Sequence, residues 1–162
     1  FNAMNGLGHR DPGVPGAAFA AGANVEMICD GIHIHPTVMR MVYKLFKERL
    51  LVISDSMSAA GLQDGEYVLG GLPVFVREGK ATLENGTIAG STTDLLKEMG
   101  IWMDDCGLSM EEILPCMTMN QARAVRMEDK IGSIEAGKAA DLIVISPKRE
   151  IRAVYKNGVR RV

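Results

Sequence analysis

The order of apolar and polar positions predicts a strand–helix–strand unit in the first third of the chain. The apolar runs at 25–30 and 50–54 have the length and composition of buried strands. A helix that opens at Pro36 is predicted between them, with one apolar face and one charged face. We expect the apolar face to consist of Val38, Met41, Val42, Leu45 and Phe46. A parallel unit of this kind gathers its chemistry at the C-terminal ends of its strands.

Shorter elements are predicted on both sides of this unit. The Gly- and Pro-rich residues 1–16 predict a loop, and the small apolar residues 16–24 predict a short helix. Short β segments separated by Gly turns, within about 66–90, predict a small antiparallel sheet. A helix that follows is expected to be N-capped by the Ser and Thr residues at 91–93.

The last third of the chain predicts further helices and then strands. Ser109 and Glu112 have the spacing of a capping box, and Pro115 is expected to divide the helical pattern that follows into two helices. The apolar run at 141–146 predicts a strand. The final residues predict a hairpin whose two-residue turn is Asn157-Gly158.

Composition narrows the class of protein. A chain of 162 residues is long enough for one domain with its own core. A net charge of −2 gives no indication of a nucleic-acid or anionic-membrane surface. The 3 cysteines are widely spaced and odd in number, which favours reduced thiols in a cytoplasmic protein. No apolar run approaches the length of a membrane span, and the first residues do not resemble a signal peptide.

Two kinds of polar residue stand at the predicted strand ends. Asp55 follows the second strand directly, where a carboxylate serves either chemistry or the capping of a turn through Ser56 or Ser58. Asp30 precedes a glycine and fits an Asx turn better than catalysis. His33 and His35 would point the same way on a strand, which raises the question of a metal site.

The loops contain two candidate anion sites. Arg10 lies among Gly and Pro residues, where its guanidinium fork could hold a phosphate; the alternative is a simple ion pair with Asp11. The turn at 87–92 consists of small residues and could offer backbone N–H groups to an anion, although such turns are more often only helix caps.

Several stretches, in this order and spacing, carry a resemblance to a known family: FNAMNGLGHRDPGVPGAA, ICDGIHIHP, VISDSMSAAGLQDGEYVLGG, NGTIAGSTTDL and GSIEAGKAADLIVI. Together they resemble the C-terminal part of the N-acetylglucosamine-6-phosphate deacetylases, metal-dependent members of the amidohydrolase superfamily. The resemblance covers the whole chain. It implies an α/β fold: the C-terminal portion of a (β/α)8 TIM barrel, with about two barrel strands, and strands of a small β-sandwich domain. The barrel part would span 1–138, with the small β insertion at about 66–90, and the sandwich strands 139–162.

The resemblance also implies a function and a set of site residues. The family hydrolyses the N-acetyl group of the phosphosugar and releases glucosamine 6-phosphate and acetate. By resemblance, Asp55 is the general base and later the acid, taking a proton from metal-bound water and passing it to the leaving amine. The substrate-binding residues implied are Asn2, Ala3, Arg10, His33, Ile88, Ala89 and Gly90, with Arg10 meeting the phosphate across a dimer interface.

The same resemblance implies where the metal is held. The family's ligands to its divalent metal, zinc first and iron or others as alternatives, lie upstream of the motif that contains Phe1. We therefore expect no metal ligand and no bound metal in this chain alone, with Asp55 near the metal of the complete enzyme. His33 matches a family position and His35 a variable one. Phe1 also suggests a piece of a longer protein, inactive alone, because two strands cannot close a barrel unless oligomerisation covers their edges.

Two alternatives remain beside the deacetylase. One is a non-catalytic chain that binds a phosphosugar through Arg10 and residues 88–90 without the metal. The other is a different amidohydrolase, resembling dihydroorotase or a deaminase. The pairing of D-G-I-H with S-D-S-M argues against the second alternative.

Overall fold

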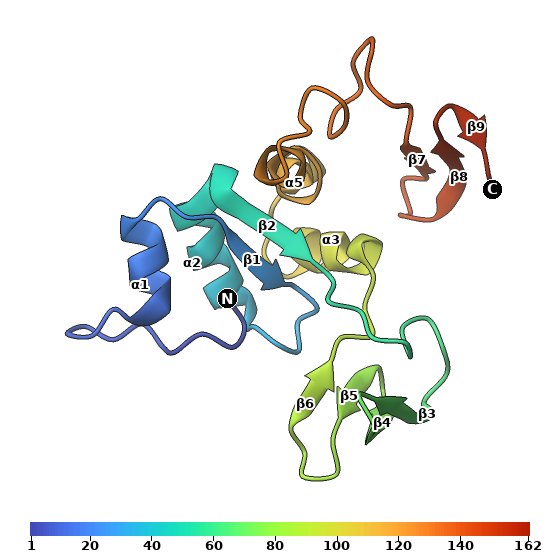
Figure 1. Ribbon diagram of the computed structural model, residues 1–162. Coiled ribbons are helices and arrows are strands. Elements are labelled where there is room, and N and C mark those ends of the chain that lie inside the picture. The colour runs from blue at the N-terminus through green and yellow to red at the C-terminus, as the bar shows by residue number, and fades with distance from the viewer.

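A parallel strand pair with its crossover helix forms the centre of the computed structural model, which describes residues 1–162 (Figure 1). Strands β1 (Val25–Ile28) and β2 (Leu50–Ile53) are adjacent and parallel, with Ile28 opposite Ile53. Helix α2 (Pro36–Phe46) and a short 3-10 turn connect them. The predicted strand–helix–strand unit is therefore confirmed, and it places the residues that follow both strands at one edge.

The buried face of α2 differs from the prediction. Met39, Val42 and Phe46 are buried, whereas Met41 and Leu45 are 52% and 46% exposed. Met41 and Leu45 border a groove of about 560 Å³ between α2, the N-terminal loop and α1 (Gly13–Ala20). The apolar stripe of α2 is thus wider than the part that packs on the core. The spacing of apolar residues did not show which part of the stripe is buried.

Side-chain amides occupy both outer edges of this strand pair. On the β1 side, Asn2 Nδ2 donates to Ile28 O (3.2 Å) and Asn2 Oδ1 accepts from Ile28 N (3.0 Å). On the β2 side, Asn120 Nδ2 donates to Leu50 O and Gln121 Nε2 donates to Val52 O, both at 2.9 Å. Some of the backbone groups that a neighbouring strand would otherwise bind are therefore satisfied within the chain.

The small antiparallel sheet predicted after Asp55 is present. It is four-stranded, in the order β3 (Gly65–Leu69), β4 (Leu72–Arg77), β5 (Lys80–Thr82), β6 (Ile88–Gly90). It has a small core of its own, in which Val74, Val76 and Ala81 pack with Met57 and Ala59 from the segment after β2. Figure 1 shows this sheet below the carboxyl ends of β1 and β2.

The helices that follow close the main core. Helix α3 (Leu95–Asp104) begins at Asp94, whose Oδ1 accepts from Lys97 N at 2.9 Å. Asp94 is therefore the N-cap, and the prediction of a cap at 91–93 is wrong because Ser91 and Thr93 bond each other instead. The capping box at Ser109 is confirmed for α4 (Met110–Ile113), and Pro115 opens a 3-10 turn before α5 (Met119–Ala124).

A three-stranded antiparallel sheet forms the C-terminal end: β7 (Leu142–Ile145), β8 (Ile151–Lys156) and β9 (Val159–Arg160). The predicted Asn157-Gly158 turn is confirmed, and both residues have positive φ (50° and 76°), as a type I′ turn requires. Arg149 connects this sheet to α3 through Asp104, at 2.7 Å. The sheet otherwise exposes apolar side chains, including Ile143 at 64%.

The three cysteines are all buried and form no disulfide. Burial raises the pKa of each thiol, to about 11 for Cys116. No helix combines the length and the apolar composition that crossing a bilayer would require.

Candidate functional site at the strand ends

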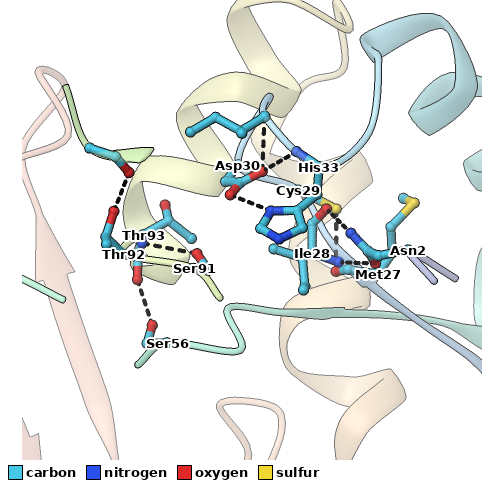
Figure 2. Close-up of polar contacts among 12 residues, drawn as sticks. Asn2, Met27, Ile28, Cys29, Asp30, His33, Ser56, Ser91, Thr92 and Thr93 are labelled. Atoms are coloured by element: carbon cyan, nitrogen blue, oxygen red, sulfur yellow. Dashed lines mark hydrogen bonds and ion pairs between the residues drawn. The ribbon is translucent and has the colours of Figure 1, made fainter. Parts of the chain in front are cut away.

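The sequence places its candidate residues in loops that leave the same edge of the strand pair. His33 lies in the loop after β1, and Asp55 lies directly after β2. Because Ile28 and Ile53 are register partners in parallel strands, both loops begin at the same level. Figure 2 shows the polar contacts around this edge, with one group from Asn2 to His33 and a second from Ser56 to Thr93.

Asp30 organises the loop that carries His33. Its Oδ1 accepts from the backbone N–H groups of Ile32 and His33, both at 2.9 Å, so the predicted Asx turn is confirmed. Its Oδ2 lies 2.8 Å from His33 Nδ1. The sequence analysis did not predict this hydrogen-bond partner of His33, although the D-G-I-H spacing of three residues offered a signal for it.

The two histidines of the H-I-H triplet do not act together. Residues 31–34 form bends rather than a strand, so the premise of a shared direction does not hold. His33 pairs with Asp30, whereas His35 is the N-cap of α2 and its Nδ1 accepts from Thr37 N at 3.2 Å. The His-x-His spacing is therefore explained by a loop residue followed by a helix cap.

Asp55 is exposed and its carboxylate makes no hydrogen bond within the chain, which leaves both oxygens available to a ligand. The alternative in which Asp55 caps a turn through Ser56 or Ser58 is not what the structure contains. Its backbone has a φ of 46°, in the left-handed region, which Asp tolerates better than most residues. Such backbone conformations are found preferentially at functional sites.

Ser91 connects Asp55 to the small sheet. Its N–H donates to Asp55 O (3.3 Å), its O accepts from Met57 N (2.9 Å), and Ser56 Oγ donates to Thr93 O (2.6 Å). Ser91 directly follows β6, the strand formed by the predicted substrate residues Ile88, Ala89 and Gly90. The predicted turn at 88–90 is thus a short strand, and Ser91 directly after it is bonded to Asp55.

The remaining predicted residues lie on the N-terminal loop. Arg10 is exposed and makes no ion pair; Asp11 instead accepts from Gly13 N at 3.2 Å. The alternative of an ion pair between Arg10 and Asp11 is therefore wrong. Asn2 uses its amide to bind β1, and Ala3 beside it is exposed.

A buried carboxyl lies behind this edge and was also missed. Glu98 on α3 is fully buried, and neither of its oxygens has a hydrogen-bond partner in the protein. Burial raises the pKa of Glu98 to about 8, with Asp30 among the smaller causes. The sequence signal was its position four residues before Trp102, on the apolar face of the helix.

No group of three or more His, Cys, Asp or Glu side chains gathers in a way that could hold a metal ion. Asp55 and His33 are the candidates nearest the strand ends, and with Nδ1 of His33 bonded to Asp30 they offer at most one carboxylate and one ring nitrogen. The side chains of this chain alone therefore do not fit a divalent metal, for which catalytic sites commonly use three protein ligands.

Comparison with known proteins supplies the context of these features. The model of the Amidohydrolase family matches residues 14–161. An N-acetylglucosamine-6-phosphate deacetylase of Bacillus subtilis is 38% identical over 154 residues, 93% of this chain and 39% of that protein. A putative N-acetylgalactosamine-6-phosphate deacetylase of Escherichia coli K12 is 31% identical over 98% of this chain and 95% of that protein.

Solved structures agree with the sequence comparison. A mutant N-acetyl-D-glucosamine-6-phosphate deacetylase of Mycobacterium smegmatis, in complex with N-acetyl-D-glucosamine-6-phosphate, has a TM-score of 0.89 and 34% identity. The match covers 99% of this chain and 43% of that chain. This chain spans about 40% of the length of the first curated relatives. The predicted fold class is confirmed: a mixed α/β chain that corresponds to part of these deacetylases, consistent with a partial barrel and a β domain.

Proposed function

The chain belongs to the amidohydrolase family, and we propose that it supplies the C-terminal part of an N-acetylglucosamine-6-phosphate deacetylase. The reaction is hydrolysis of the N-acetyl group to give glucosamine 6-phosphate and acetate. The observation that carries the proposal is the free Asp55 carboxylate at the end of β2, held beside β6 through Ser91. The complete enzyme then requires the polypeptide that corresponds to the N-terminal part of the longer relatives.

Asp55 is proposed to move the proton in both steps. Its ionised carboxylate accepts a proton from the water that attacks the acetyl carbonyl. As the bond between the carbonyl carbon and the nitrogen breaks, Asp55 returns this proton to the leaving amine, so that amine and acetate are both released. A single side chain serves both steps because an exposed carboxylate without internal hydrogen bonds can approach water and then the amine.

The other predicted residues are proposed to hold the sugar phosphate. His33 lies in the loop at the same edge of the strand pair as Asp55, and β6 (Ile88–Gly90) leads to Ser91 beside Asp55, so we assign both to the sugar. Arg10 is assigned to the phosphate, because an unpaired guanidinium offers a fork that matches phosphate oxygens. We assign Asn2 and Ala3 to contacts with the substrate through their main chain, because the side chain of Asn2 is bonded to β1.

The family implies a divalent metal in the full-length enzyme, and we propose zinc, held by residues outside this chain. The steps above use only this chain's own groups, since they do not assemble a metal site. We also propose a cytoplasmic homodimer in which Arg10 reaches the phosphate of the neighbouring subunit's substrate.

A second candidate function is the same reaction on a different sugar, N-acetylgalactosamine 6-phosphate. Two of the relatives are named as N-acetylgalactosamine-6-phosphate deacetylases, and one of them is almost fully covered by this chain. The test is acetate release by the complete enzyme from both phosphosugars and from N-acetylglucosamine, with Asp55→Asn as the inactive comparison. Faster acetate release from N-acetylgalactosamine 6-phosphate would make that sugar the substrate in place of N-acetylglucosamine 6-phosphate. No release from either phosphosugar would overturn the proposed function.

A further inference from the structure

The Asp30 carboxylate fixes which nitrogen of His33 carries the proton. Asp30 Oδ1 is occupied by two backbone N–H groups, and Oδ2 lies 2.8 Å from His33 Nδ1. The Asp30 side chain is only 5% exposed and that of His33 13%. An ionised carboxylate only accepts hydrogen bonds, so Nδ1 must be the donor. In the neutral ring, Nε2 of His33 is then left without a proton and acts as an acceptor.

His35 has the opposite arrangement in the same loop. Its Nδ1 accepts a hydrogen bond from the backbone N–H of Thr37 at 3.2 Å. A ring nitrogen that accepts carries no proton, so the neutral ring of His35 holds its proton on Nε2. The two histidines of H-I-H therefore have different tautomers, and His35 is a built-in comparison for His33.

We propose that Asp30 is a positioning residue that presents Nε2 of His33 to the substrate as a hydrogen-bond acceptor. The inference rests on the proposed function, because it assigns a role to His33 in the same site. A neutral acceptor nitrogen recognises a donor, which on an acylated amino sugar is a hydroxyl or the amide N–H. Asp30 also fixes the ring direction, since the same carboxylate holds the His33 backbone. Figure 2 shows the ring with its second nitrogen turned away from Asp30.

Asp30→Asn is the sharpest variant for this proposal. The Asn Oδ1 can keep both turn hydrogen bonds, while its NH₂ group replaces the oxygen that faced Nδ1. An N–H donor at this position favours a ring with bare Nδ1 and the proton on Nε2, so the tautomer is reversed. The matched control is Asp94→Asn, which removes another carboxylate near Glu98 and keeps the N-cap bond to Lys97, because Asn caps helices as well as Asp.

The first measurement is the ¹⁵N NMR spectrum of the histidine rings in the 162-residue chain, at a pH where they are neutral. We expect Nδ1 of His33 to be protonated, His35 to show the opposite pattern, Asp30→Asn to reverse His33 alone, and Asp94→Asn to change neither. A protonated Nε2 on His33 in the unmodified chain would overturn the proposal. A backbone amide spectrum of each variant checks that the fold is retained.

The second measurement is the pH profile of kcat/KM for the complete enzyme. Asp30→Asn should lower kcat/KM by about 10- to 100-fold, as expected when one substrate hydrogen bond becomes a clash of donors. It should also shift the pH profile, while Asp94→Asn should do neither. If His33→Ala loses activity but Asp30→Asn keeps its rate and profile, the positioning role is wrong and the proposed function stands. If the unmodified enzyme releases no acetate, the proposed function fails, while the NMR spectrum still decides the tautomer.

Discussion

The backbone N–H of Ser91 donates to the carbonyl oxygen of Asp55 at 3.3 Å. The two residues are 36 positions apart, and the whole four-stranded antiparallel sheet lies between them in the sequence. This bond, with the bridge between Ser56 and Ser91, holds Asp55 where its φ is 46°. The small sheet therefore contributes to the site, because Ser91, which is bonded to the proposed base, directly follows its last strand.

Asp55→Asn should remove most of the activity and leave the fold intact. The amide cannot accept the proton of the attacking water, so we expect kcat to fall by about 10²- to 10⁴-fold, the usual range for general acid–base catalysis. Asn tolerates left-handed backbone, so the melting temperature should be nearly unchanged. Asp55→Ala, at the same φ, should lower the free energy of unfolding by about 1 kcal/mol. A kcat near that of the unmodified enzyme in Asp55→Asn would rule out Asp55 as the base.

Arg10→Ala should harm the reaction selectively. Loss of a bidentate, charge-assisted contact to phosphate should cost about 2–4 kcal/mol, or about 30- to 1000-fold in kcat/KM on the phosphorylated sugar. Any activity on unphosphorylated N-acetylglucosamine should barely change, and Arg10→Lys should recover only part of the loss. Equal losses on both sugars would mean that Arg10 only stabilises its loop.

Glu98 should make the chain less stable as the pH rises. Burial raises its pKa to about 8 in the folded chain from an ordinary value of 4.5, so between these values the folded state holds a proton that the unfolded state has released. The free energy of unfolding should fall through this window, by at most about 1.4 kcal/mol per pH unit from this group. Glu98→Gln should remove that component of the slope, measured by denaturant unfolding between pH 5 and about 8.

The exposed Glu84 provides the control for Glu98. Glu84→Gln should keep the slope of the unmodified chain, because an exposed carboxyl gains no such dependence from burial. The N-terminal amine, whose pKa burial lowers, acts in the opposite direction near the top of the window, but it is common to all three proteins and cancels in the difference. The same slope in Glu98→Gln and the unmodified chain would contradict the prediction.

Asn120→Asp should destabilise the chain strongly. Asn120 is 3% exposed, and its Nδ2 donates to both Lys47 O (3.0 Å) and Leu50 O (2.9 Å). A carboxylate offers no donor and places an unpaired charge among carbonyl oxygens, so we expect a loss of about 3 kcal/mol, seen as a melting temperature lower by about 6–12 °C. The same change at exposed Asn24 should shift the melting temperature little.

This chain alone should not retain one equivalent of zinc after dialysis. Nδ1 of His35 caps a helix, so at most Asp55 and Nε2 of His33 are available, where catalytic zinc usually has three ligands from the protein. Metal analysis of the dialysed chain and of His33→Ala tests this. Stoichiometric zinc that disappears in His33→Ala would restore the two-histidine metal site.

Local patterns in the sequence predicted local structure well. Asn157-Gly158, the capping box at Ser109 and the break at Pro115 depend on neighbouring residues, and all are present. The face of α2 was predicted less well, because helical spacing gives a stripe but not the neighbour that covers it. Met39 is buried while Met41 is half exposed, and only the packing of α1 and the N-terminal loop decides this.

The candidate site residues came from sequence motifs and the family resemblance, and their roles remain predictions. The contacts that hold the surrounding elements in place were not predicted. The contacts of Asn120 and Gln121 with β2 join residues about 70 positions apart. Glu98 lies on an apolar helix face, where a single carboxyl is easily taken for a residue at the boundary of the core. Such contacts depend on the tertiary arrangement, which neither periodicity nor spacing contains.

The amides on the edges of the parallel pair have a consequence for self-association. Asn2 on β1 and Asn120 and Gln121 on β2 occupy part of the outer backbone edge of these strands. β7 is the edge strand of the C-terminal sheet, and it carries the apolar run Leu142–Ile145 with Ile143 and Val144 exposed. β7 is therefore an edge at which another molecule could add a strand, and a charged side chain at position 143 would oppose this without touching the strand-end site.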